Sequence, residues 1–205
     1  MKRLTLLEEW YKKLGSEYSG HHGHKGVPGQ RGGSAPRSSG SLDVYSELKT
    51  FIGRLTRTGG DIGEITLSDE ARELLQETVT EESLHLYRGF GLVKGRIAED
   101  KMWEIKRMRP GDPIPEGLLT KQGNVFASYT HKKSIAKQYS EGKVSLVVEA
   151  NVPKNKVVVD TRNLQRVLKA HGQEGLFSEG AYSYFKSEAE VIVQDPTPVT
   201  VFSVK

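Results

Sequence analysis

The carboxylates of Glu188 and Glu190 are the groups in this chain whose type and spacing best suit chemistry. They flank Ala189 directly before the β-branched run 191–193, which is typical of a buried strand. Strand side chains alternate, so we predict that both carboxylates leave one face of one strand, with Cα atoms roughly 6.5–7 Å apart. Such a pair can stabilise positive charge and move a proton. Solvated Glu pairs also protect edge strands, so the pair alone does not define a site.

A second polar signal is Arg88, at the end of an alternating segment that predicts a strand over 84–89. Leu84, Leu86 and Arg88 share one face of this strand. An arginine that continues an apolar face is costly unless an anion meets it, although a surface arginine at a strand end is the structural alternative. Arg88 is therefore a candidate anion ligand.

A third polar signal lies in the predicted strand 124–130, which contains Phe126-Ala127-Ser128-Tyr129-Thr130. Ser128 and Thr130 share a face and Tyr129 faces away. A hydroxyl at its free pKa needs a base to act as a nucleophile, and none is evident nearby. The pair is better suited to donate and accept hydrogen bonds.

Hydrophobic periodicity predicts an α+β domain over residues 42–205. The closing segments are a loop over 172–185, rich in glycine and aromatic residues, and a strand over 199–204. The other predicted elements are helices over 42–58, 68–78, 96–108, 131–139 and 161–170, and strands over 144–152 and 156–160.

The composition of the 205-residue chain predicts a core together with a polar, poorly ordered part, because hydrophobic content is 36% and mean hydropathy is −0.52. There are no cysteines, which excludes disulfides and Cys-type zinc sites. The net charge of +4 and the pI near 9.1 allow contact with nucleic acid or an acidic partner. No apolar run reaches the ~18–20 residues that span a bilayer, and Glu8 and Glu9 interrupt any secretory h-region. We therefore expect no membrane segment.

The N-terminal part predicts an amphipathic helix over 1–15 and a flexible linker rich in Gly, Ser, His and Arg over 16–41. His21, His22 and His24 suggest metal capture, but a glycine-rich carrier supplies no closed shell, so no metal site is assigned. The linker is similar to Gly/Arg-rich stretches of tailed-phage head-morphogenesis and virion proteins. The helix is interpreted either as docking on its own domain or as a tag that binds a partner.

The order of the three polar motifs resembles the arginine-serine-glutamate class of mono-ADP-ribosyltransferases. An aromatic-Arg-Gly at 87–89 is followed by Phe-x-Ser-x-Thr at 126–130 and Glu-x-Glu at 188–190, and the likeness covers about residues 84–205. Thr130 stands where serine is commoner but keeps the hydroxyl. The resemblance implies an NAD-binding cleft between two small, roughly perpendicular antiparallel or mixed sheets flanked by helices. It requires no Rossmann turn, and the segment 89–91 lacks the third glycine of that fingerprint.

The resemblance also implies the roles of the site residues. Arg88 would bind the NAD phosphates and Gly89 would approach the nicotinamide amide, while Ser128 would orient Glu190 and Thr130 would support the same strand end. Glu190 would stabilise the oxocarbenium-like transition state and Glu188 would position or deprotonate the acceptor. A glutamate at position 188 goes with arginine acceptors in the family.

The implied substrates are NAD, as co-substrate, and a target protein. The aromatic loop corresponds to the family's substrate-recognition loop, so Phe177, Tyr182, Tyr184 and Phe185 are candidates to stack on the target, with packing in the core as the alternative. Two other functions stay open: an NAD glycohydrolase on the same scaffold, and a virion or nucleic-acid-binding module that acts through residues 1–41. We expect location in a host cytoplasm, or in the virion if a phage encodes the chain.

Overall fold

The computed structural model describes residues 43–58, 67–92, 99–114, 126–142, 144–194 and 198–205. The chain divides into two units, Met1–Ser39 and Gly40–Lys205, and all described residues belong to the second. The predicted helix over 1–15 and linker over 16–41, with their three histidines, lie outside the described residues.

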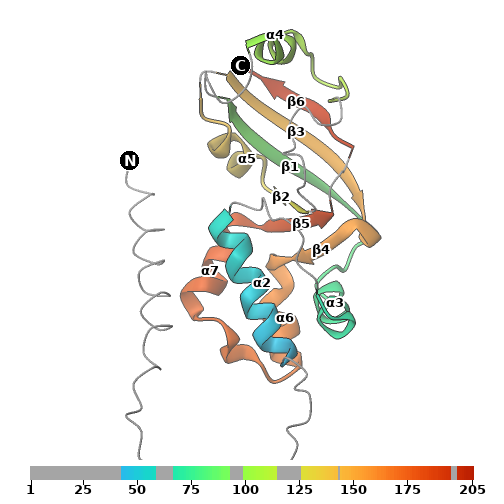
Figure 1. Ribbon diagram of the computed structural model, residues 1–205, viewed down its shortest axis with the longest axis vertical. Coiled ribbons are helices and arrows are strands. Elements are labelled where there is room, and N and C mark those ends of the chain that lie inside the picture. The colour runs from blue at the N-terminus through green and yellow to red at the C-terminus, as the bar shows by residue number, and fades with distance from the viewer. Residues whose placement is uncertain (1–42, 59–66, 93–98, 115–125, 143, 195–197) are drawn as a thin grey trace, which may run out of the picture. The chain divides into compact units, whose positions relative to one another are not determined.

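The described residues form an α+β domain, as the periodicity predicts, and most elements begin and end within a few residues of the predicted bounds (Figure 1). Two 3-10 turns, Lys154–Lys156 and Glu174–Leu176, complete the set. The helices are α2 (Val44–Thr58), α3 (Asp69–Gln76), α4 (Glu99–Arg107), α5 (Lys133–Tyr139), α6 (Thr161–Ala170) and α7 (Glu179–Glu188). The strands are β1 (Ser83–Leu92), β2 (Phe126–Thr130), β3 (Val144–Pro153), β4 (Val157–Asp160), β5 (Glu190–Gln194) and β6 (Thr200–Val204).

The strands form one six-stranded sheet of order β4-β5-β2-β1-β3-β6, with every neighbouring pair antiparallel. The expectation of two separate sheets is therefore wrong. The described residues of β1 and β2 pair at Tyr87↔Thr130 alone. By contrast, β1 pairs with β3 along its whole length, and so does β2 with β5. One narrow junction thus joins β4, β5 and β2 to β1, β3 and β6, and in Figure 1 β4 and β5 run in a different direction from β1, β3 and β6.

Apolar side chains from both halves of the sheet meet in one core. Leu84 and Leu86 of β1 cluster with Tyr129 of β2 and with Val191 and Val193 of β5, and all five are at least 96% buried. The hydrophobic effect makes this burial the main force that holds the halves together. A second cluster buries Ile105 of α4 against β3 and β6, as the predicted helix face requires.

Helix α5 lies against β1 with almost no space between the two backbones. A Cβ built on Gly89 would lie 1.8 Å from the carbonyl oxygen of Ala136, and one built on Gly91 would lie 2.3 Å from that of Glu141. Only glycine permits this approach. The helices α2, α6 and α7 gather beside β4 and β5 (Figure 1).

The predicted loop over 172–185 is wrong, because α7 occupies its second half. Ser178 caps the helix by accepting a hydrogen bond from the amide of Ala181 at 3.3 Å, and Ala189 ends it. Tyr182 and Phe185 lie three apart on its inner face and are 2% and 1% exposed, respectively. Burial of these rings outweighs the glycine content that favours a loop.

Candidate active site

Glu190 begins β5 at the place where the two halves of the sheet join. It pairs with Thr130, which in turn pairs with Tyr87 across the junction. Paired strand residues share a face, so Ser128, Thr130 and Glu190 lie on the same side of the sheet, as predicted for the two hydroxyls. The Ser128 hydroxyl donates to Oε1 of Glu190 at 2.5 Å. The predicted contact between hydroxyl and carboxylate is therefore present.

Glu188 is the last residue of α7, so the prediction that it shares a strand face with Glu190 is wrong. Between them, Ala189 adopts the left-handed conformation, with φ 49° and ψ 44°, alone among the described non-glycine residues. This conformation costs an L-residue about 1–2 kcal/mol. Burial and the charge of Glu188 raise the pKa of Glu190, although the Ser128 hydrogen bond opposes them.

The segment that carries both carboxylates is held by its backbone carbonyls. A helix leaves its last four carbonyls without helical partners. Here side chains and an amide from β2, from the β2–α5 connection and from α6 donate to carbonyls of the last turn of α7 and of the two residues that follow it. The bonds are Lys132 Nζ to Lys186 O (3.1 Å) and Ser187 O (2.8 Å), Thr130 Oγ1 to Glu188 O (2.6 Å), His131 N to Ala189 O (3.2 Å), and Thr161 Oγ1 to Glu190 O (2.7 Å). The position of the carboxylates is thus set by residues 130–132 together with Thr161.

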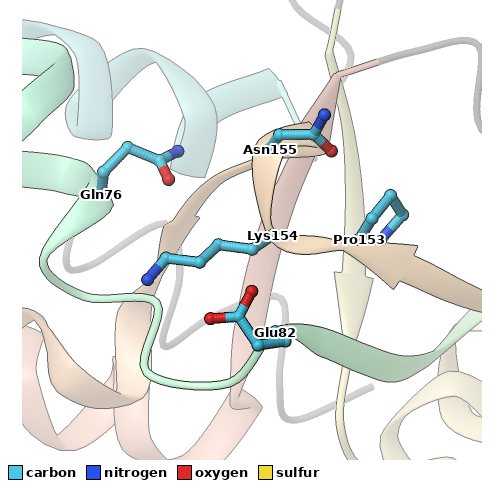
Figure 2. A pocket seen from close by; sticks show the side chains of 5 residues that line it. All are labelled: Gln76, Glu82, Pro153, Lys154 and Asn155. Carbon is cyan, nitrogen blue, oxygen red and sulfur yellow. The ribbon is translucent and has the colours of Figure 1, made fainter.

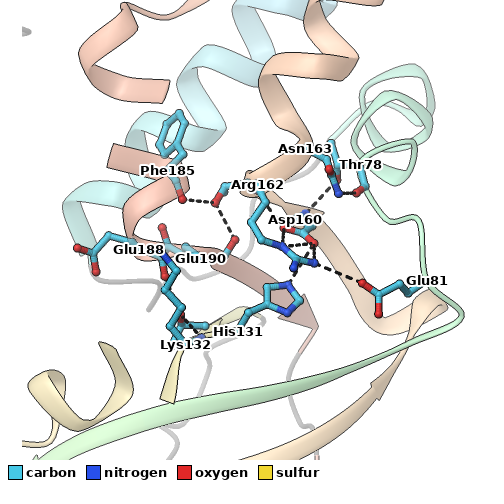
Figure 3. A network of polar contacts seen from close by, with 12 residues as sticks. Thr78, Glu81, His131, Lys132, Asp160, Arg162, Asn163, Phe185, Glu188 and Glu190 are labelled. Carbon is cyan, nitrogen blue, oxygen red and sulfur yellow. Dashed lines mark hydrogen bonds and ion pairs between the residues drawn. The ribbon is translucent and has the colours of Figure 1, made fainter. Parts of the chain in front are cut away.

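A buried carboxylate, Asp160, contacts His131 of this support and Arg162 (Figure 3). It is 1% exposed, and Nε2 of His131 and Nη2 of Arg162 lie 3.1 and 2.7 Å from its Oδ2. Burial would raise the pKa of Asp160, but the hydrogen bonds and charges of His131 and Arg162 lower it below its usual range. Asp160 therefore stays ionised at neutral pH and fixes His131, the neighbour of Thr130. The available sequence signal was an aspartate between a strand and a helix, where it acts as N-cap.

Two tyrosines complete the cluster, and the sequence did not single out the first. The Tyr139 hydroxyl, at the end of α5, donates to Oε2 of Glu188 at 3.1 Å and is hydrogen-bonded to Tyr184 of α7. Partial desolvation of its hydroxyl and the charge of Glu188 raise the pKa of Tyr139 to about 12, although 58% of the residue is exposed. Burial, the neighbouring phenol and Glu190 also raise the pKa of Tyr184. Both phenols therefore remain hydrogen-bond donors at neutral pH, beside the two carboxylates.

Arg88 lies one residue beyond the junction, and its side chain takes a different direction from the hydroxyl-carboxylate contact. It follows Tyr87 and so leaves β1 on the opposite face. Its guanidinium carbon lies 4.9 Å from the ring centre of Phe90 and 5.8 Å from that of Tyr129. The backbone of Arg88 is thus close to the Ser128–Glu190 contact along the sheet, but its guanidinium lies on the other face, against the rings of Phe90 and Tyr129.

The structure divides the other predicted site residues. Thr130 lies in the cluster. Gly89 faces the backbone of α5, where a Cβ would clash. This close contact explains why the residue is glycine, and no ligand is needed to explain it. Of the predicted target-binding aromatics, Tyr182 and Phe185 are in the core, whereas Phe177 and Tyr184 are partly exposed.

None of the protein-family models matches this chain, and searches of curated proteins and of solved structures return no significant match. Within the described residues, no group of three or more His, Cys, Asp or Glu side chains could hold a metal ion. Among the helices of the same ranges, none has the length and apolar character needed to cross a bilayer.

A separate hollow of about 390 Å³ lies at the turn between β3 and β4 (Figure 2). Its lining includes both Glu82 and Lys154, and Gln76 donates from one wall to the carbonyl of Val157. The hollow shares no residue with the carboxylate cluster. We take the candidate site to be the cluster around Glu188 and Glu190, because its carboxylates, hydroxyls and phenols contact one another.

The pH dependence of this cluster gives a first prediction. If the chain cleaves NAD, as the order of the three motifs implies, and the reaction requires ionised Glu190, kcat/KM falls at low pH, with a midpoint above the ordinary glutamate value of 4.5 because the pKa of Glu190 is raised. Ser128→Ala removes the hydrogen bond that lowers this pKa, so the midpoint should move to still higher pH. The measurement is kcat/KM from pH 4 to 9. Ser134→Ala, at an exposed position on α5, is the matched control, and an unmoved or lower midpoint in Ser128→Ala contradicts the role assigned to Ser128.

Proposed function

We propose that the protein is an NAD-dependent mono-ADP-ribosyltransferase that transfers ADP-ribose to arginine in a target protein. One observation carries the proposal: Glu190 accepts a hydrogen bond from Ser128, and Glu188 precedes it by two residues across the tight turn at Ala189. The order of the three motifs adds support. Neither feature depends on a Rossmann-type nucleotide site.

The chemistry explains why Glu190 is placed in this way. Cleavage breaks the bond between ribose C1′ and the nicotinamide nitrogen, and nicotinamide leaves with the electron pair. Positive charge develops on the sugar, and a fixed, partly desolvated carboxylate stabilises that state more than it stabilises NAD. One carboxylate oxygen of Glu190 would bind the ribose 2′-hydroxyl, while the other, Oε1, accepts the hydrogen bond from Ser128.

Glu188 is assigned to the acceptor. A guanidinium nitrogen attacks C1′ and loses its proton to Glu188, which closes the reaction with ADP-ribosyl arginine and nicotinamide as products. Tyr139 holds Oε2 of Glu188 and so fixes the carboxylate. If water attacks instead, the product is free ADP-ribose and the same site acts as a glycohydrolase.

The direct test incubates the full chain with NAD labelled in the adenosine part and a host lysate, then compares released nicotinamide with protein-bound label. Equal amounts indicate transfer, and the modified residue is read by mass spectrometry. Nicotinamide with free ADP-ribose indicates the glycohydrolase, and no release of nicotinamide rejects both. Removal of residues 1–41 should leave this chemistry intact, because every residue assigned to it lies beyond them.

The role of Arg88 can be tested separately. Arg88 leaves the opposite face of the sheet from Ser128 and Glu190, so it can bind the NAD phosphates only if the dinucleotide extends past the junction to that face. In that case Arg88→Gln should raise KM for NAD about tenfold with little change in kcat, as expected for lost phosphate binding. Arg109→Gln, a change at an exposed residue after α4, controls for the loss of one charge. Unchanged kinetics in Arg88→Gln would reduce Arg88 to a packing role against Phe90 and Tyr129.

A further inference from the structure

Helices α6 and α7 enclose a hollow of about 500 Å³ that the proposed chemistry does not use. The described residues that line it are all polar, and none is acidic. They are Arg162, Asn163, Gln165, Arg166 and Lys169 of α6, and Lys186 of α7. Four of these six side chains are cationic, so the hollow favours an anionic ligand.

The four cations differ in how far they are already engaged. Arg162 is bound to Asp160 and also contacts Oε1 of Glu81 at 3.5 Å, so it acts mainly within the protein. Arg166, Lys169 and Lys186 are exposed, and Arg166 also donates one long hydrogen bond, of 3.5 Å, from Nη2 to the carbonyl of Glu77. Arg166 and Lys169 lie three residues apart on one face of α6. Three cations are therefore presented to solvent around one depression.

The chemistry of the lining selects among anionic partners. Interfaces with proteins have aromatic anchors at the centre and few lysines. The described lining of this hollow has no aromatic side chain and contains two lysines. Single-stranded nucleic acid is bound by aromatic side chains that stack on bases, and the described lining has none. Arginine, lysine and amide side chains are the groups that contact the backbone phosphates of duplexes.

We propose that the hollow between α6 and α7 binds the phosphate backbone of duplex nucleic acid without reading its sequence. Arg166, Lys169 and Lys186 would each contact a phosphate, while Asn163 and Gln165 would add neutral contacts. The proposal is independent of NAD chemistry. Because α7 carries both Lys186 and Glu188, a bound duplex would lie next to the end of the helix that bears the acceptor-side carboxylate.

The test measures binding of a fluorescent 20-base-pair DNA duplex to the full chain by anisotropy, over a series of salt concentrations. The variant R166Q/K169Q/K186Q is compared with K101Q/K106Q/R107Q, which removes the same number of exposed charges from α4. Residues 1–42 are present in both variants and contribute equally. We expect the first variant to bind at least about tenfold more weakly at ~100 mM salt, with a log–log salt slope smaller by about 2 to 3, and the second to match the wild type.

Two results would overturn the proposal. One is binding by R166Q/K169Q/K186Q within twofold of the wild type. The other is displacement of the wild-type protein from DNA by polyglutamate as effectively as by unlabelled duplex of equal charge, which would identify an acidic protein as the partner. Chemical acetylation gives an independent readout on the unmutated chain: the duplex should protect Lys169 and Lys186 but leave Lys101 reactive, and equal reactivity of all three would also reject the hollow.

Discussion

Replacing Glu190 with Gln is expected to reduce NAD cleavage by about 10³-fold. The substitution keeps the shape and the contact with Ser128 but removes the charge that would face the developing cation, and loss of one preorganised electrostatic contact costs about 10²–10³ in rate. The measurement is release of nicotinamide under saturating NAD. Because the loss is in the transition state, kcat should fall more than KM rises.

Stability provides the control for Glu190→Gln. Burial and Glu188 raise the folded-state pKa of Glu190, so the folded protein binds its proton more tightly than the unfolded chain does. The contribution of Glu190 to the free energy of unfolding is therefore fully present below pH 4.5, and it is lost as the pH rises through the raised pKa of the folded state. A neutral glutamine removes this penalty, so the variant should melt at the same or a higher temperature at neutral pH. An inactive variant that melts earlier would leave Glu190 as a structural residue.

Glu188→Gln separates the two carboxylates. It should abolish transfer to protein while hydrolysis of NAD persists, because Glu188 is assigned to the acceptor and Glu190 to the sugar. Tyr139 can still hydrogen-bond to the amide oxygen, so the end of α7 should keep its place. Equal loss of hydrolysis in both variants would show that the division of roles is wrong.

The second large effect is expected from Gly89→Ala, and it concerns stability. The new Cβ would lie 1.8 Å from the carbonyl oxygen of Ala136 and 2.9 Å from the amide nitrogen of Ser140, both backbone atoms of or adjoining α5. Overpacking against backbone costs about 3 kcal/mol, which lowers the melting temperature by roughly 6–12 °C in a domain of this size. Thermal unfolding followed by circular dichroism measures the change.

Gly53→Ala is the matched control for Gly89→Ala. Gly53 lies within α2, and a Cβ there meets no atom within 4 Å, so alanine should raise stability by about 0.5–1 kcal/mol. A Gly89→Ala variant with an unchanged melting temperature but weaker NAD binding would show that the glycine serves the ligand. Loss of stability instead identifies it as the place where α5 is seated on β1.

Local patterns predicted most of the fold because the elements follow from short-range features. Helix α3 begins after Ser68, whose hydroxyl accepts from the amide of Ala71, and α2 ends just before Gly59, as their sequence signals indicate. The single sheet could not be predicted, since pairing of Tyr87 with Thr130 depends on how two distant strands meet. The sequence pattern predicts where the strands lie, but it does not predict how many residues of β1 and β2 pair with each other.

At the candidate site, the sequence predicted residue types better than it predicted geometry. The contact between Ser128 and Glu190 follows from two strands that pair. The helical placement of Glu188 was missed because Glu-x-Glu before a β-branched run looks like the start of a strand, while the burial of Phe185 and Tyr182 extends α7 to Glu188. Asp160 and Tyr139 were missed because their importance depends on neighbours that are distant in sequence.

The carbonyl caps of α7 have a consequence for how the protein folds. Thr130 is 58 residues from the carbonyl it holds, and Lys132 is 54 and 55 residues from its two partners. Closing so long a loop costs entropy before any contact compensates, so the carboxylates reach their final arrangement only after distant parts of the chain have met. A fragment that starts at α6 would carry both acids and Thr161 but lack the donors of residues 130–132, whereas a nascent chain contains those donors before either acid is synthesised. Both acids are therefore held in place only once the complete tertiary structure has formed.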